Sequence, residues 1–411
     1  MSETRTLFTG GLVFDGTGSE PQPADVVIAG GRIVEIGTGL DGDHAVDCTG
    51  RAVLPGFFDC HVHLMVNGLD PIGVRHRPFS LAFYEAAASM RATLAAGITT
   101  VREAGGADLG VMEAQRRGLI AGPRMQIAII MIHQTGGHGD PWEASGTRGG
   151  LFVPHPGRPS GTVDGPDEVR RKVRELVRAG ATVIKCATSG GVLSPRSNPR
   201  HGHFRADEVT VMVQEAAAAG LAVMAHAQAT DGIKTAVRAG VRSIEHGIYL
   251  DDEAIELMRE RGTWLVPTLM APRGVFAAAE AGVPVAEHQL AKARMVAEAH
   301  TDSVRRAIAA GVRVAMGTDS GVTPHGQNLG ELPLLVDAGM TPAQALHATT
   351  LSAAQLMGLD DQLGSIAPGK RADLVIVDGD PLDVATLGDR IVSVYQDGVL
   401  VHQREQAEKV E

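Results

Sequence analysis

Six side chains with metal-binding chemistry occur near the ends of short apolar segments of this chain. They are four histidines, one lysine and one aspartate: His61, His63, Lys185, His226, His246 and Asp319. One residue separates His61 from His63, so in a strand both imidazoles point to the same side. Imidazole nitrogens and carboxylate oxygens suit Zn²⁺ or another divalent transition ion. A lone His-x-His pair more often belongs to an ordinary core, but the ordered combination predicts a metal site.

Lys185 is the unexpected member of this set. The chain has only six lysines against 31 arginines, yet a lysine stands inside the apolar segment Thr182-Val183-Ile184-Lys185-Cys186-Ala187. An amine, unlike a guanidinium, can add carbon dioxide and become an anionic carbamate that bridges two ions. The alternative interpretation is a buried lysine paired with an acid. The five other side chains at strand ends favour the carbamate.

The segments that must position these side chains alternate between short apolar strands and Ala-rich amphipathic helices, as in repeated βα units. Eight strands are expected, at 57–64, 98–103, 125–133, 182–187, 222–228, 243–247, 264–269 and 312–320. Helices are expected at 167–179, 207–219, 252–261 and 291–310. The pattern predicts an α/β fold, a (β/α)8 TIM barrel that brings the six side chains to one mouth.

Both ends of the chain contain short strands joined by tight turns. The expected strands are at 7–14, 25–29, 32–36, 372–377, 391–396 and 399–401. Neither end can bury a sheet face alone, so we expect one small β-sandwich domain from residues 1–56 plus 365–411, with the barrel at 57–364. Two irregular loops, 134–166 and 188–204, follow the third and fourth strands and are expected at the mouth.

Composition narrows the possible partners. Acidic residues exceed basic ones by 48 − 37 = 11, and aromatic residues make up 3% of the chain, which argues against nucleic acids and anionic membranes. Cys48, Cys60 and Cys186 have no C-x-x-C spacing, so neither a disulfide framework nor a thiolate zinc site is indicated. No signal peptide or membrane-spanning run is evident. We expect a cytoplasmic protein with a small-molecule substrate.

The segment Gly56-Phe57-Phe58-Asp59-Cys60-His61-Val62-His63 resembles the first-strand motif of the amidohydrolase superfamily. Within that superfamily the chain looks like the prolidase-like branch of Xaa-Pro dipeptidases and carboxypeptidases. The segments that carry this resemblance are Gln134-Thr135-Gly136-Gly137-His138, Ile184-Lys185, Ser189-Gly190-Gly191-Val192, Ala225-His226-Ala227, Ile244-Glu245-His246-Gly247 and Met316-Gly317-Thr318-Asp319-Ser320.

The resemblance implies a dinuclear site, typically dizinc. By position, one ion is held by His61, His63 and Asp319. The other is held by His226 and His246, and a carboxylated Lys185 (N6-carboxylysine) bridges the two. Relatives in the superfamily are commonly oligomeric, so a homo-oligomer is expected.

The implied reaction is hydrolysis of an amide bond in a dipeptide or an N-acyl amino acid, including amide-linked xenobiotics or toxins. A hydroxide shared by two ions about 3.5–4 Å apart attacks the carbonyl. Asp319 acts as the general base and passes the proton to the leaving amine. His138 donates a hydrogen bond to the developing oxyanion or to a substrate carboxylate.

Four further residues are candidates for substrate binding. Gln228 stands where a tyrosine often binds substrate in the prolidase-like branch. Arg196, Arg200 and His203 lie in the loop 188–204, where a guanidinium can clamp a carboxylate. The alternative for these three is a solvated loop without a substrate contact.

Three other functions remain open. A deaminase usually works with one metal and a catalytic Glu, so Lys185 argues against it. An esterase, lactonase or phosphotriesterase can use the same hydroxide, and comparing rates on an N-acyl amino acid, a lactone and a phosphotriester would decide. A scaffold protein that has lost its metal would also have lost ligands, and all six are present.

Overall fold

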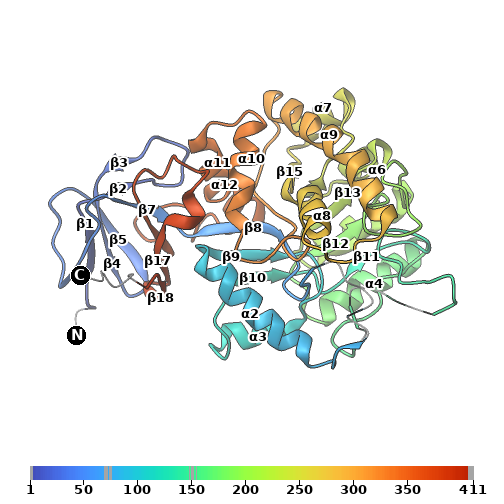
Figure 1. The fold of residues 1–411 in the computed structure, drawn as a ribbon, viewed down its shortest axis with the longest axis horizontal. Helices are drawn as coiled ribbons and strands as arrows, with labels where there is room; N and C mark the ends of the chain where they lie inside the picture. The colour runs from blue at the N-terminus through green and yellow to red at the C-terminus, as the bar shows by residue number, and fades with distance from the viewer. Residues whose placement is uncertain are drawn as a thin grey trace.

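The computed structural model describes residues 3–405 except 69–72, 74–75, 148, 150–151 and 154. The chain ends assigned to the β-sandwich domain, at 1–2 and 406–411, and part of the loop 134–166 thus lie outside the described residues. Figure 1 shows a group of strands from both chain ends beside a larger body of alternating strands and helices.

The strands of the larger body are parallel and form two sheets in the described residues. One has the order β10-β9-β8 and the other β11-β12-β13-β14-β15. Their bounds are β8 Phe57–Val62, β9 Ile98–Glu103, β10 Arg124–Ile127, β11 Met131–Ile132, β12 Ile184–Ala187, β13 Val223–Ala227, β14 Ser243–His246 and β15 Trp264–Val266. Every residue of β8, β9 and β12 to β15 is buried, as expected for parallel strands covered by helices.

The helices follow the strands along the chain and lie around them (Figure 1). Asp108 caps α3 by accepting from Val111 N, and Gly240 and Gly262 end α6 and α7 in the left-handed conformation. The helices are α2 Leu81–Ala95, α3 Leu109–Arg116, α4 Pro166–Arg178, α5 Ala206–Ala218, α6 Thr230–Ala239, α7 Asp252–Arg261, α8 Met270–Glu280, α9 Glu287–Ala309, α10 Glu331–Asp337, α11 Pro342–Ala348 and α12 Leu351–Met357, with 3₁₀ turns η1 Asn328–Gly330 and η2 Leu387–Arg390. None of the helices within the described ranges has the length and apolar character needed to cross a membrane.

Three expected strands differ from the structure. The strand expected at 7–14 is divided into Thr6–Thr9 and Leu12–Val13, which belong to different sheets, because the backbone turns at Gly10, with a φ of 82°. The strand expected at 125–133 is divided into β10 and β11, because Ile129 has a φ of 67° and interrupts the extended backbone. The prediction of a continuous strand at 312–320 is wrong. Within the described residues this segment pairs with the strands of the larger body through isolated parallel bridges, Val314 with Leu265 and Ser320 with Val62, and Ser320 also bridges to Thr323. Its backbone leaves the strand pattern where Met316 N donates to Ala348 O and where Asp319 has a φ of 61°.

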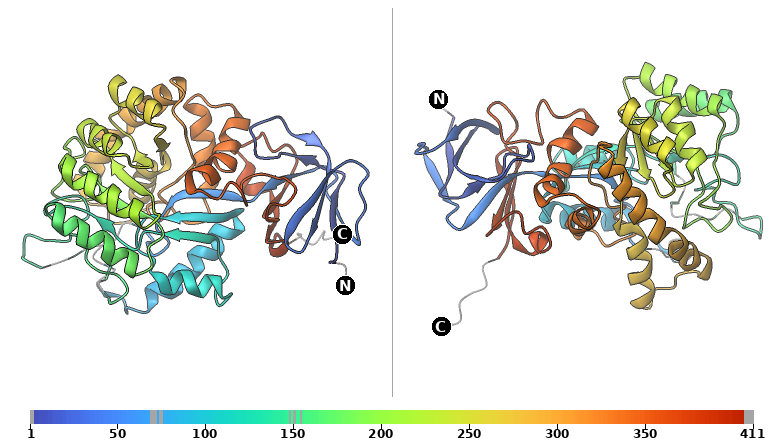
Figure 2. Two further views of the ribbon diagram at one scale, coloured as in Figure 1. Left: turned by 180° about the vertical axis from the view of Figure 1, so that it is seen from behind. Right: turned by 90° about the horizontal axis from the view of Figure 1, so that it is seen from above.

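Strands from the two chain ends share one sheet. Its order is β18-β17-β16-β7-β2-β3, and β7 pairs antiparallel with β16, with Leu54 opposite Val375. A second sheet has the order β5-β4-β1-β6. The bounds are β1 Thr6–Thr9, β2 Leu12–Val13, β3 Gln22–Pro23, β4 Asp25–Ala29, β5 Arg32–Gly37, β6 His44–Asp47, β7 Arg51–Pro55, β16 Leu374–Asp378, β17 Ile391–Gln396 and β18 Val399–Gln403. Figure 2 shows these strands together at one end of the molecule.

Candidate metal centre

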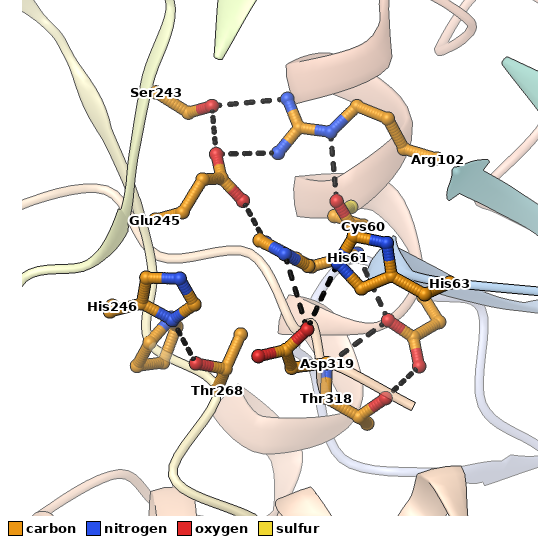
Figure 3. Close-up of polar contacts among 12 residues, drawn as sticks. Cys60, His61, His63, Arg102, Ser243, Glu245, His246, Thr268, Thr318 and Asp319 are labelled. Atoms are coloured by element: carbon orange, nitrogen blue, oxygen red, sulfur yellow. Dashed lines mark hydrogen bonds and ion pairs between the residues drawn. The ribbon is translucent and has the colours of Figure 1, made fainter. Parts of the chain in front are cut away.

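His61, His63 and Asp319 come together where β8 ends (Figure 3). One ligand atom from each side chain lies within 4.8 Å of the other two. Asp319 Oδ1 is 3.5 Å from His61 Nε2 and 3.3 Å from His63 Nε2. The structure thus brings together, from opposite ends of the larger body's sequence, three of the six residues that sequence analysis selected.

The protonation states of His61 and Asp319 suit a cation. Burial, followed by the nearby Lys185, lowers the pKa of His61 to about 4, so its imidazole is neutral at neutral pH. Burial opposes ionisation of Asp319, but His61 and His63 together hold its pKa well below its usual range. A neutral imidazole and an ionised carboxylate are the forms that bind metals.

Glu245 orients His61 from behind (Figure 3). His61 Nδ1 donates to Glu245 Oε2 at 2.7 Å, which leaves Nε2 facing Asp319. Burial would raise the pKa of Glu245, but the Arg102 guanidinium and His61 lower it to about 2. Arg102 Nη2 donates to Glu245 at 2.9 Å and its Nη1 to Ser243 Oγ at 3.0 Å. This buried network fixes one tautomer and one ring orientation of His61.

Asp59 joins β8 to the segment that carries Asp319. Its Oδ1 accepts from His61 N at 3.0 Å and from Thr318 N at 3.1 Å. Its Oδ2 accepts from Thr318 Oγ1 at 2.6 Å and from Asn328 Nδ2 at 2.7 Å. Burial raises the pKa of this fully buried carboxyl to about 6. Four hydrogen bonds therefore set the spacing between His61 and Asp319 where a regular strand pairing is missing.

His63 is held by the end of the next strand. Its Nδ1 donates to Gly105 O at 2.7 Å, so Nε2 is the nitrogen that faces Asp319. Although burial disfavours the imidazolium, the Asp319 carboxylate raises the pKa of His63. His61 and His63 therefore present the same ring nitrogen to one point.

The other three predicted ligands lie on β12, β13 and β14 beside this group. The ring of His246 is 5.1 Å from that of His61 and 4.6 Å from that of His226, measured between centroids. His246 Nδ1 contacts Thr268 Oγ1 at 2.7 Å, and His226 Nε2 donates to Gly190 O at 3.1 Å. These contacts leave His246 Nε2 and His226 Nδ1 for a ligand, and burial lowers the pKa of both imidazoles well below the usual value.

Lys185 is 1% exposed, and its Nζ has no hydrogen-bond partner in the described residues. Burial lowers its pKa to about 8, which increases the fraction of neutral, nucleophilic amine. An amine buried without a partner is costly, so this position calls for a group that satisfies it. The donor set therefore fits a divalent metal site: three imidazole and carboxylate ligands gathered together, two oriented imidazoles, and an amine that no group of the described residues satisfies.

The candidate substrate-binding residues fall into two groups. His138 stacks on His226 with ring centroids 4.2 Å apart, and its Nδ1 contacts Ser194 Oγ at 2.5 Å. Gln228 and His203 are buried, and Gln228 Oε1 and His203 Nδ1 lack partners in the described part of the chain. These three residues lie close to the metal-binding side chains or in the loop that covers them.

Arg196 and Arg200 point elsewhere in this structure. The Arg196 guanidinium lies over the Trp142 ring at 4.6 Å and donates to Trp142 O at 2.9 Å. The Arg200 guanidinium lies over the Tyr249 ring at 4.3 Å. Both are thus held by aromatic rings, and their roles in substrate binding remain predictions.

Lys292 of α9 holds the loop 188–204 against the body of the protein. Its ammonium donates to three backbone carbonyls, those of Gly191, Ser194 and Ser197. The same loop contacts His138 through Ser194 and His226 through Gly190. The position of His138 therefore depends on this loop.

Sequence analysis missed the residues that support the ligands, chiefly Asp59, Arg102 and Glu245. Arg102 and Glu245 lie within apolar strands, and charged residues are almost never fully buried without a partner. Two charged residues in strands expected to be buried on both faces could have indicated that each needs a buried partner. The sequence could not identify which residue that partner is.

The fold and this site define a class, α/β proteins of the TIM-barrel type with a metal site at the strand ends. The Amidohydrolase family profile matches residues 52–401. The chain belongs to this family, whose members generally use a divalent metal site, and it is an enzyme that hydrolyses amide C–N bonds.

Individual relatives refine this placement. Ochratoxinase from Aspergillus niger is 34% identical over 401 residues, covering 92% of this chain and 82% of that protein. A crystal structure of a Xaa-Pro dipeptidase with bound methionine has a TM-score of 0.88 and 34% identity, covering 98% of this chain and 100% of that one. A prolidase complexed with N-methylphosphonate-L-proline has a TM-score of 0.90 and 37% identity over the same shares. The expected prolidase-like branch is confirmed.

Proposed function

We propose that this enzyme cleaves the amide bond of a dipeptide or an N-acyl amino acid, including amide-linked xenobiotics or toxins, at a dinuclear metal site. The observation that carries the proposal is the partnerless Lys185 amine beside two sets of oriented ligands. The names of two relatives, an ochratoxinase and a Xaa-Pro dipeptidase, support this choice of substrate.

In this proposal His61 Nε2, His63 Nε2 and Asp319 would hold one zinc ion, and His226 Nδ1 and His246 Nε2 would hold the other. Lys185, carboxylated on Nζ, would supply a carbamate as a further ligand. When bound, the ions supply a nucleophile from water near neutral pH and polarise the scissile carbonyl.

The protein's own residues perform the remaining steps. Asp319, ionised because of its two histidine neighbours, accepts the proton of the attacking water and delivers it to the leaving nitrogen. His138 is neutral, since burial lowers its pKa to about 3. If Ser194 Oγ donates to Nδ1, the ring proton is on Nε2, where it can stabilise negative charge on the carbonyl oxygen.

Gln228 and His203 are proposed to contact the substrate, because each has a buried polar atom without a partner in the described residues. Arg196 and Arg200 would contact it only after leaving the rings of Trp142 and Tyr249. The latter two assignments therefore require a movement of the loop 188–204.

The finer points of architecture form part of the same proposal. The parallel strands, with β10 and β11 counted as one, and the segment 312–320 close into one eight-stranded barrel spanning 57–364, supported by the bridges to Leu265 and Val62. Residues 1–56 plus 365–411 form the β-sandwich domain, supported by the sheet that β7 and β16 share. We also propose a cytoplasmic homo-oligomer with a small-molecule substrate, without nucleic-acid or membrane partners.

The test is a substrate comparison on purified enzyme with its metal content measured. We expect two equivalents of a divalent metal, and kcat/KM values for dipeptides and N-acyl amino acids well above those for a matched ester, a lactone and a phosphotriester. Faster turnover of the ester, lactone or phosphotriester would contradict the proposed substrate class. One equivalent of metal would contradict the dinuclear site.

A further inference from the structure

Arg158 is a buried cation with few partners. It follows a turn closed by a hydrogen bond from Arg158 N to His155 O, and the residue is 6% exposed. Its Nη1 donates to Val153 O at 3.2 Å, while Nε has no partner in the described residues. The guanidinium carbon lies 5.0 Å from the centroid of the Phe152 ring. A guanidinium has five N–H donors, and at least the one on Nε is left for a ligand among the described residues.

No carboxylate in the described part of the chain forms an ion pair with Arg158, although two acids lie near enough to affect its pKa. Asp108 accepts from Val111 N as the cap of α3. Glu103 accepts from Gly105 N at 3.1 Å. Burial lowers the pKa of Arg158, but a guanidinium stays protonated near neutral pH. Arg158 therefore carries a buried positive charge that no carboxylate of the described residues pairs with directly.

A cavity of about 50 Å³ lies beside the Arg158 guanidinium. Apolar side chains form most of its wall, among them Met65, Phe83 and Phe152. An apolar cavity that binds benzene measures about 150 Å³, so this one suits a smaller group, the size of a carboxylate. Arg77, the other cation on its wall, already pairs with Glu85 at 3.2 Å.

The cavity is close to the candidate metal centre. Phe152, which lies against Arg158, has its ring centroid 6.4 Å from that of His63. Met65 and Val66 of the cavity wall lie two and three residues after His63 along the chain. The Phe152 ring thus links the cavity wall to the candidate metal centre through its contacts with both Arg158 and His63.

We propose that this cavity is the subsite for a carboxylate of the substrate and that Arg158 binds it. The inference rests on the proposed function, because it assigns one group of the same substrate. The fork of Nε and an Nη group matches the two oxygens of a carboxylate, and the apolar wall strengthens the pair by excluding water. Arg158 then takes the role that sequence analysis gave to Arg196 and Arg200.

The carboxylate can come from either side of the scissile bond, and two substrate pairs separate these sources. The first pair is an N-acetyl amino acid and its primary amide, which lacks the α-carboxylate. The second is an N-succinyl and an N-butanoyl amino acid, which differ in a carboxylate on the acyl side. Each pair is assayed with the wild type, Arg158→Met, Arg158→Lys and, as the matched control, Arg174→Met, which removes an exposed arginine that pairs with Glu215 away from the cavity.

For one of the pairs, we expect Arg158→Met to lower kcat/KM for the carboxylate-bearing member by about 100-fold and to change that of its partner less than about threefold. The substrate pair that shows this loss identifies the side of the scissile bond on which the bound carboxylate lies. Arg158→Lys should restore part of the loss, because the charge remains but the fork is gone. Arg174→Met should leave both ratios unchanged. An equal effect of Arg158→Met on both members of both pairs, or no effect, would overturn the proposal.

A binding measurement separates this inference from the proposed function. In titration calorimetry on the metal-free protein, the wild type should bind the carboxylate-bearing member of the affected pair more tightly than its partner, and Arg158→Met should lose this preference. If the wild type cleaves neither the four amides nor any dipeptide, the proposed function fails, and the same titration of both pairs decides the subsite. Equal affinities of the wild type for both members of each pair would then reject the proposed carboxylate subsite at Arg158.

Discussion

Two networks of arginines and carboxylates lie in different regions of this protein. Behind His61, Arg102 and Glu245 form a pair whose side chains are 2% and 0% exposed. Near the strands of the two chain ends, Asp397 pairs with Arg371, and these side chains are 39% and 34% exposed. The groups are chemically the same, but only the first pair is removed from water. The first network positions His61, a candidate metal ligand, whereas the second joins Asp397 to Arg371 and Arg124.

Losing a hydrogen-bond partner costs more free energy in the buried pair than in the exposed pair. Glu245 accepts from His61, Arg102 and Ser243, so loss of one partner leaves a charge in a medium that cannot solvate it. Asp397 accepts from Arg124 and Arg371, and water can replace either of them. We therefore expect large effects in the first region and small effects in the second.

The largest effect should come from Lys185→Ala in the buried region. Removing the amine should abolish bound metal and lower kcat by several orders of magnitude, with partial recovery on adding a short-chain carboxylate. The matched control is Lys234→Ala, which removes a surface lysine that pairs with Asp251 and Glu253. Full activity and metal content in Lys185→Ala would remove this lysine from the site.

Glu245→Gln should weaken metal binding without removing a ligand. The amide keeps the shape but not the charge that orients His61, and such changes weaken metal affinity by about 10–100-fold. Competition with a chelator measures the affinity directly, without reference to turnover. An unchanged dissociation constant would show that Glu245 does not position His61.

Arg102→Met should destabilise the metal-free protein by about 3–5 kcal/mol, because Glu245 keeps a buried charge without its guanidinium. The same substitution at Arg371 should cost less than about 1 kcal/mol. Urea unfolding of both variants measures the difference in the free energy of unfolding. Equal costs would refute the contrast drawn between the two networks.

Asp397→Asn should have the smallest effect, below about 1 kcal/mol at pH 7, because both partners are partly exposed. Asn also tolerates the positive φ of 51° at this position. Although burial acts in the opposite direction, Arg371 and Arg124 hold the pKa of Asp397 below its usual 3.8. The carboxylate therefore stabilises the fold above that value, and the contribution is lost as the pH falls through the folded-state pKa.

Thermal unfolding of the wild type and Asp397→Asn across this range is the measurement. The difference in Tm should be present at pH 7 and disappear below the folded-state pKa. A difference that persists at the lowest pH would assign it to packing and not to the charge.

Much of the fold follows from local patterns. The strand 98–103 and the helix 252–261 have the expected bounds, because each has a clear period and a clear stop. The segment 312–320 does not, because its backbone conformation depends on hydrogen bonds to β8 and to Ala348, far away in the sequence. The hydrogen bonds of Asp59 replace the regular pairing there.

The sequence by itself determined which side chains can bind metal and that they lie where the strands of one α/β fold end. This was possible because strand ends in repeated βα units meet at one edge, so residue type and position along each strand suffice. The family resemblance, now supported by the comparisons, rests on the same residues. The assignment of individual ligands remains a prediction that Lys185→Ala and Glu245→Gln test.

Only the tertiary structure decided how these side chains are held. Arg102 and Glu245 meet across strands more than a hundred residues apart, and Arg158 lies beside a cavity that no spacing in the sequence indicates. Whether a charge is paired, exposed or left without an anion depends on burial and on the identity of its neighbours. Both are set when distant segments pack together, which is why the supporting residues and the cavity emerged only from the folded chain.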